Sequence, residues 1–260
     1  MASRAQMQQL GRQLPPVVSQ LGVKVLNAAA FPGVMRHYVS SWREYRSLPG
    51  AEPLRLRDAH PQLWDRLSVS PFDAHYFHQD VWAARRVAEH APPRHVDVGS
   101  RVDLVGFLTA LCPVTFVDIR PLEAHIPDLE STPGSVLAMP FADQALPSVS
   151  CLHVAEHIGL GRYGDPLDPQ GSRKAAAELQ RVLAPGGQLL FSGPVGAPRV
   201  CFNAHRVHDP LEVLTWFDEL ELASFAGVDD EGRFGEHMNP ADLVGQRYAC
   251  GMFCLQRPAA

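Results

Sequence analysis

The chain has 260 residues, with 23 Lys and Arg against 28 Asp and Glu, and a formal net charge of −5. This charge gives no electrostatic reason to bind a nucleic-acid backbone, so no nucleic-acid partner is expected. Hydrophobic residues make up 46% of the chain, enough for an ordinary globular core. The five cysteines are scattered without a C-x-x-C pair, which favours free thiols in a reducing compartment. Without an apolar run of about 18 residues or a signal-like start, the sequence predicts a cytoplasmic protein.

The sequence predicts two parts, a helical appendage at residues 1–70 and a main domain at residues 71–260. Prolines divide this stretch into short pieces, and Val34, Tyr38 and Trp42 recur at helical spacing between charged residues. The segment from Val17 to Met35 is fairly apolar but is interrupted by polar residues. Packing onto the protein is favoured for this segment, although a helix lying on a membrane surface remains an alternative.

The main domain begins with a helix at 71–90, followed by a strand at Arg94–Gly99 and a helix with apolar residues at 104–111. Residues 113–118 form a continuous apolar run, typical of a strand covered on both faces. Asp118 lies 21 positions after Asp97, at the end of this strand. A glycine turn followed by an acid at this spacing is typical of nucleoside-binding sheets, in which the carboxylate accepts hydrogen bonds from ribose.

Residues 148–192 show a further alternation of strand and helix patterns. Residues 148–154 read as a strand and residues 172–183 as an amphipathic helix that stops at Pro185-Gly186-Gly187, and a strand at 188–192 follows directly. A strand, a helix and a strand with short links make a crossover unit, which predicts a parallel sheet. Asp209 is expected to cap another helix, and residues 220–225 and 247–255 to form the last two strands.

Three motifs carry a resemblance to a known family. The sequences Met139-Pro140-Phe141, Glu156-His157 and ELQRVLAPGG at 178–187 occur in this order. They resemble the second half of class I S-adenosylmethionine-dependent methyltransferases. The runs HIGLGRYGDPLDP and FNAHRV are similar to one branch of that superfamily, catalogued as a domain of unknown function.

The resemblance implies an α/β fold: a Rossmann-like, seven-stranded, mostly parallel sheet with helices on both faces, closed by an antiparallel last strand. It implies S-adenosyl-L-methionine as cofactor and no metal. The implied cofactor-binding residues are Asp97, Gly99, Ser100, Arg101, Asp118, Ile119, Met139 and His153.

The chain departs from the family pattern at three positions. The family's usual first motif is D-x-G-x-G, and Arg101 replaces its second glycine. Ser135 stands where an aspartate often contacts adenine, and Pro147 stands where an acidic residue often precedes the fourth strand. Arg101 brings a side chain to a close-approach position, or else pairs with the methionyl carboxylate of the cofactor. These departures motivate an alternative in which the chain is a non-catalytic scaffold with a methyltransferase fold.

The acceptor of the methyl group is expected to be a small polar molecule, with a sugar hydroxyl or glycan precursor as the best single candidate from the resemblance. A hydroxyl acceptor needs a general base, and histidine is the usual choice. The candidate bases are His157, His205 and then Asp165, which lies in a glycine-rich loop at 159–171. The oligomeric state stays undetermined.

The run His153-Val154-Ala155-Glu156-His157 also matches a zinc-protease pattern, in which both histidines and the acid lie on one helix. Here the residues span a strand end and a turn, so a metal-dependent hydrolase using His153, His157, His205 and the loop aspartates is the weaker alternative. A nicotinamide-linked dehydrogenase would leave the Pro-Gly-Gly helix end and the Glu-His pair unexplained.

Overall fold

The computed structural model describes residues 16–259, with side chains from residue 28 onward. The chain divides into two compact units, and the boundary between them falls between Pro71 and Phe72. The first unit contains the helix α2 (Pro16–Ser47) and the short helix η1 (Leu56–Asp58). The first fifteen residues of the expected appendage, and the buried or exposed faces of Val17–Asn27, lie outside the part described. Within the described residues, no helix is both long and apolar enough to cross a bilayer.

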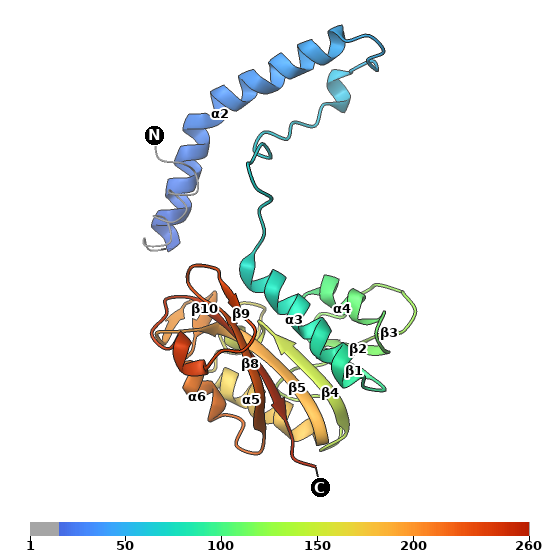
Figure 1. The fold of residues 1–260 in the computed structure, drawn as a ribbon, viewed down its shortest axis with the longest axis vertical. Helices are drawn as coiled ribbons and strands as arrows, with labels where there is room; N and C mark the ends of the chain where they lie inside the picture. The colour runs from blue at the N-terminus through green and yellow to red at the C-terminus, as the bar shows by residue number, and fades with distance from the viewer. Residues whose placement is uncertain (1–15, 260) are drawn as a thin grey trace. The chain divides into compact units, whose positions relative to one another are not determined.

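The helix α2 corrects one expectation. Pro32 lies inside it, so the Pro32-Gly33 step does not divide the segment into two pieces. A proline removes one backbone hydrogen bond and usually bends a helix without necessarily ending it. Figure 1 shows α2 bending partway along its length. Val34, Tyr38 and Trp42 are half-buried while most of their neighbours are exposed, as their spacing predicts.

The second unit is built on one sheet of eight strands in the order β3-β2-β1-β4-β5-β10-β8-β9. The strands β1 to β5 run parallel, and β10 pairs antiparallel with both β5 and β8. The sheet confirms the predicted mostly parallel architecture, and the eighth strand is the two-residue edge β9 (Phe234–Gly235). The bounds of the other strands are β1 His95–Val98, β2 Val114–Asp118, β3 Leu129–Pro133, β4 Leu146–Leu152, β5 Leu183–Val195, β8 Glu221–Val228 and β10 Ala249–Gln256.

Helices cover both faces of the sheet (Figure 1). On one face, α5 (Gly171–Val182) and α6 (Pro210–Leu214) pack against one buried cluster, and on the other α3 (Ala74–His90) and α4 (Val102–Leu108) pack against a second. The helix α5 buries its predicted apolar stripe and ends just before Pro185. Asp209 caps α6 by accepting from the main-chain nitrogens of Leu211 and Glu212, as expected.

The segments that follow the parallel strands form the site. A 3-10 turn, η2 (Ala155–His157), follows β4, and the last short 3-10 helix, η3 (Pro240–Leu243), precedes β10. Residues 197–208 contain a small antiparallel ribbon of β6 (Arg199–Cys201) and β7 (His205–Val207). In parallel sheets, ligands bind beyond the carboxyl ends of the strands, where these connections gather.

Candidate functional site at the carboxyl ends of the strands

Two adjoining cavities lie beyond the carboxyl ends of β1, β2 and β4. The smaller has a volume of about 80 Å³ and includes Asp118 and Ile119 in its lining, whereas the larger measures about 260 Å³ and includes Arg101 and His205. Both cavities are lined by the same four residues, Gly99, His153, His157 and Tyr163. A ligand in the smaller cavity would therefore lie next to a ligand in the larger one, with these four residues contacting both.

The smaller cavity is shaped by the close approach of β1 and β2. Gly99 has a positive φ of +67°, a conformation that glycine adopts without strain. A Cβ atom at this position would lie 3.3 Å from Val154 Cγ1 and 3.6 Å from Asp118 Oδ2. The absence of this side chain leaves space beside a carboxylate that is mostly buried. The residues present therefore fit a nucleoside, whose ribose hydroxyls would donate to Asp118.

Asp97 stabilises the turn at Gly99 and Ser100 through hydrogen bonds. Its carboxylate accepts from the main-chain nitrogen of Ser100 at 3.0 Å and from the hydroxyl of Ser150, and its side chain is fully buried. Burial raises the pKa of Asp97 to about 6. The hydroxyl of Ser100 in turn accepts from the main-chain nitrogen of Leu152 at 3.2 Å, which ties β1 to β4. Asp97 thus orients the glycine turn and lines neither cavity.

Arg101 turns its side chain toward α3. Its guanidinium lies 3.0 Å from Asp103, 3.9 Å from Asp80 and 5.2 Å from the centre of the Tyr76 ring. Arg101 directly precedes α4 as its N-cap and lines the larger cavity, while the smaller cavity with Asp118 is lined by Gly99 and not by Arg101. The side chain that replaces the family's second glycine therefore does not fill the space beside Asp118.

A buried pair, His153 and Glu156, lies where the two cavities meet. His153 Nδ1 lies 2.9 Å from Glu156 Oε1, and its Nε2 lies 3.4 Å from Cys250 Sγ. Burial lowers the pKa of His153, but Cys250 and Glu156 more than offset this and leave it well above its usual range. His153 follows β4 and His157 ends η2, so the two do not share a helix as in a zinc protease. Glu156 joins them instead, because its Oε1 also lies 3.6 Å from His157 Nε2.

His157 lines both cavities, and one of its ring nitrogens is anchored. Its Nδ1 donates to the main-chain oxygen of Ala204 at 2.6 Å. Burial lowers the pKa of His157, with Glu156 acting in the opposite direction. A neutral ring that donates through Nδ1 keeps a lone pair on Nε2, so His157 can accept a proton.

His205 lies across the larger cavity, with its ring centre 5.1 Å from that of Tyr248. Burial lowers the pKa of His205 as well. Asp165 is placed differently, because its carboxylate accepts from the main-chain nitrogens of Gly159 and Tyr163 at 2.6 and 3.2 Å. Asp165 therefore organises the glycine-rich loop and does not line either cavity.

The structure brings together most of the predicted residues. Gly99, Ser100, Arg101, Asp118, Ile119, His153, His157 and His205 line one cavity or both, whereas Asp97, Met139 and Asp165 line neither. Met139 belongs to the buried core, and its main-chain nitrogen donates to Glu178. The prediction did not include Glu156, Tyr163 and Tyr248 as site residues. Glu156 was visible as half of the Glu-His motif, while the tyrosines gave no local signal.

Comparison with solved structures identifies the class of fold. The chain is similar to the 4+2 cyclase SpnF, with 15% identity over 70% of this chain and 82% of that one and a TM-score of 0.50. It is also similar to a candidate sarcosine dimethylglycine methyltransferase of Galdieria sulphuraria, with 14% identity over 70% and 86% of the two chains and a TM-score of 0.51. With the sheet order above, these matches show that the chain has the class I methyltransferase fold. The cyclase illustrates that the fold alone does not fix the reaction.

Residues 141–243, less than half of the chain, match the family described as Caenorhabditis protein of unknown function, DUF268. The match confirms the predicted resemblance to a branch of the superfamily catalogued as a domain of unknown function. It covers η2, the glycine-rich loop, α5, β5 and the β6–β7 ribbon, so it includes His153, His157 and His205. No curated protein matches the chain.

Proposed function

We propose that this protein transfers a methyl group from S-adenosylmethionine to a polar acceptor. The observation that carries the proposal is the juxtaposition of Gly99 and Asp118 in a cavity that shares four lining residues with a larger one. Asp118 and the main chain at Gly99 would hold the nucleoside part of the cofactor. The larger cavity, beyond His153 and His157, would hold the acceptor.

The cofactor supplies an activated methyl group when bound, so the chain's own task is to position the acceptor and remove its proton. Orientation in a closed site supplies much of the rate in such a transfer. His157 is the base in this proposal, because Nδ1 is anchored on Ala204 and the pKa is lowered by burial. His205 faces the same cavity without an anchored ring nitrogen among its described contacts and would contact the acceptor.

The larger cavity also limits the acceptor. Its lining is rich in hydrogen-bonding groups, namely Tyr76, Arg101, His153, Glu156, His157, Arg162, Tyr163, His205 and Tyr248. Arg162, which lines the larger cavity, and Arg120, which lines the smaller one, both lie over the Tyr163 ring, at 5.0 and 4.5 Å from its centre. Positive charge is therefore placed where the two cavities adjoin. These groups favour a polar, hydroxyl-bearing acceptor such as a sugar over an apolar one.

Calorimetric titration of the full chain with S-adenosylhomocysteine tests the proposal. Micromolar binding is expected, and Asp118→Ala should weaken it by at least about tenfold, since a charge-assisted hydrogen bond contributes about 1.5–3 kcal/mol. Glu123→Ala is the control, because this exposed carboxylate follows β2 but lines neither cavity. Absence of binding at millimolar ligand would contradict the proposal and favour a scaffold role.

A further inference from the structure

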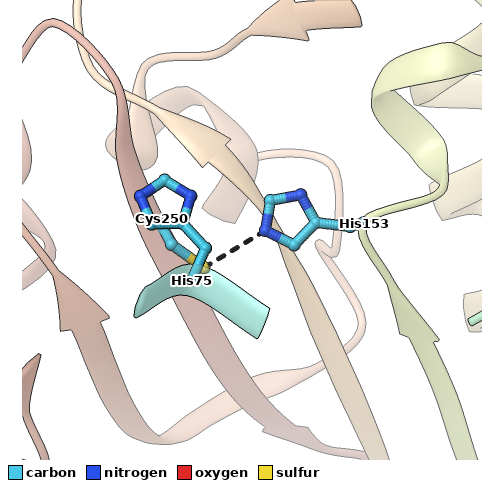
Figure 2. A group of neighbouring side chains, drawn as sticks. All are labelled: His75, His153 and Cys250. Atoms are coloured by element: carbon cyan, nitrogen blue, oxygen red, sulfur yellow. Dashed lines mark hydrogen bonds between the residues drawn. The ribbon is translucent and has the colours of Figure 1, made fainter. Parts of the chain in front are cut away.

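Two histidines and a cysteine from three separate segments lie close together, and one of them, His153, lines the larger cavity. His75 lies in the first turn of α3, His153 follows β4, and Cys250 lies in β10. Figure 2 shows the three side chains gathered around one point. One possible ligand atom from each side chain lies within 4.8 Å of the others.

The closest pair already has the spacing of two ligands on one ion. Cys250 Sγ and His153 Nε2 are 3.4 Å apart. In a tetrahedral zinc site, with bonds of about 2.3 Å to sulfur and about 2.0 Å to nitrogen, these atoms are about 3.5 Å apart. The third member is the half-buried His75 ring, which stacks on Tyr248 at 5.1 Å and has a ring nitrogen within 4.8 Å of a ligand atom of each of the other two residues.

His153 is oriented as metal-bound histidines are. Its Nδ1 donates to Glu156 Oε1 at 2.9 Å, and its other ring nitrogen, Nε2, is the one that faces Cys250. A histidine that binds a metal typically donates its other ring N–H to a carboxylate in this way. His153 also has a positive φ of +55°, although it is not glycine. Such main-chain strain persists where surrounding contacts fix a residue, and it is concentrated at functional sites.

We propose that His75, His153 and Cys250 bind a zinc ion. One thiolate and two neutral imidazoles are donors that suit zinc, and the Glu156 carboxylate behind His153 adds a second negative charge to balance the ion. Three protein ligands leave a fourth position for water or a small molecule, the arrangement of catalytic zinc sites. His153 also lines the larger cavity, so a zinc ion bound to it would lie near the space assigned to the acceptor. The metal site does not depend on the cofactor proposal.

Metal binding by the purified full chain tests the inference. Zinc is titrated in competition with a chromophoric chelator, and cobalt is used as a spectroscopic substitute. We expect one equivalent per chain and a cobalt spectrum with a thiolate charge-transfer band and tetrahedral visible bands. Cys250→Ser should abolish the thiolate band, and His75→Ala should weaken zinc binding at least tenfold. Glu156→Gln should weaken it about 10- to 100-fold through the loss of His153 orientation.

Two matched variants control for unspecific effects. Cys254→Ser removes an equally buried thiol from the same strand, and His78→Ala removes a histidine from the next turn of α3. Both should bind zinc as the parent chain does. Equal binding by Cys250→Ser and Cys254→Ser would overturn the inference. So would a folded parent chain whose cobalt complex lacks the thiolate band, a result that requires no variant to fold.

Titration of the same preparations with S-adenosylhomocysteine keeps the two proposals separate. Zinc binding without S-adenosylhomocysteine binding supports the metal site and contradicts the cofactor site. The opposite result supports the cofactor site and leaves Cys250 and His153 as a pair that shares a proton, which contradicts the metal site.

Discussion

The buried guanidinium of Arg206 donates to the main-chain oxygen of Asp168 at 3.0 Å and to that of Ile158 at 2.6 Å. Ile158 directly precedes the glycine-rich loop and Asp168 lies near its far end, so one side chain of the β6–β7 ribbon contacts the segment close to both of its ends. Asp168 also donates from its main-chain nitrogen to Gly159 at 2.9 Å, which closes the loop on itself. The loop therefore has a defined conformation although it contains little regular secondary structure.

Replacing Arg206 should loosen this loop. Each hydrogen bond from a charged donor contributes about 1.5–3 kcal/mol, so Arg206→Met should raise the rate of tryptic cleavage after the exposed Arg162 by at least about tenfold. Limited proteolysis followed by mass spectrometry measures this rate. Arg199→Met is the control, because Arg199 is exposed and donates to the main-chain oxygen of nearby Ala197. Equal cleavage of the two variants would mean that Arg206 does not hold the loop.

Gly99 should be required for cofactor binding for two reasons, its left-handed main-chain conformation and the space that its missing side chain leaves beside Asp118. Gly99→Ala forces a side chain into a left-handed conformation, at a cost of about 1 kcal/mol, and narrows the gap beside Asp118. We expect S-adenosylhomocysteine to bind at least tenfold more weakly by calorimetry. Gly164→Ala carries the same main-chain strain, with a φ of +86°, but has no atom within 4 Å of its Cβ and should bind normally. Parallel losses in both variants would point to general destabilisation.

The raised pKa of Asp97 predicts a specific dependence of stability on pH. The pKa of Asp97 is about 6 in the folded chain against 3.8 in an unfolded one. Between these two pH values, the carboxyl group is protonated in the folded state and ionised in the unfolded state. The contribution of Asp97 to the free energy of unfolding is therefore present below about pH 4 and is lost as the pH rises through 6, a change of about 3 kcal/mol.

Asp97→Asn removes this titration. Relative to the parent chain, the variant should gain about 3 kcal/mol of stability between pH 4 and pH 7, whatever its absolute stability. Urea unfolding followed by circular dichroism at several pH values measures the difference between the two chains. A constant difference across this range would show that Asp97 is ionised in the folded chain throughout.

His157 should affect turnover more than cofactor affinity. Its removal as general base is expected to lower the rate by about 10²- to 10⁴-fold. His157→Asn should leave S-adenosylhomocysteine binding within a few-fold of the parent value while methyl transfer to an acceptor found by screening is largely lost. His205→Asn should raise KM more than it lowers kcat, because this histidine is assigned to acceptor contact. The reverse pattern would exchange the two roles.

Local pattern predicted much of the fold. Apolar periodicity indicated α3, α5, β1, β2, β4 and β10, and turn and cap residues such as Asp209 and Pro185 indicated where helices begin and end. Among the elements that these patterns did not predict, β3 and α2 have clear physical reasons. The strand β3 is a half-exposed edge strand of mostly polar residues, so it has no apolar run. The helix α2 continues through Pro32, because the loss of one hydrogen bond does not outweigh the rest of a 32-residue helix.

The sequence by itself determined the α/β class, the family resemblance and the pairing of a glycine turn with Asp118, because these depend on residues close together or at fixed spacing along the chain. Only the tertiary structure decided that Asp97 is buried beneath that turn and that Glu156 links His153 to His157. It alone also brought His75 and Cys250 to His153. The order of strands places β10 against β5, next to β4, and local sequence patterns do not encode contacts made across such distances in the chain.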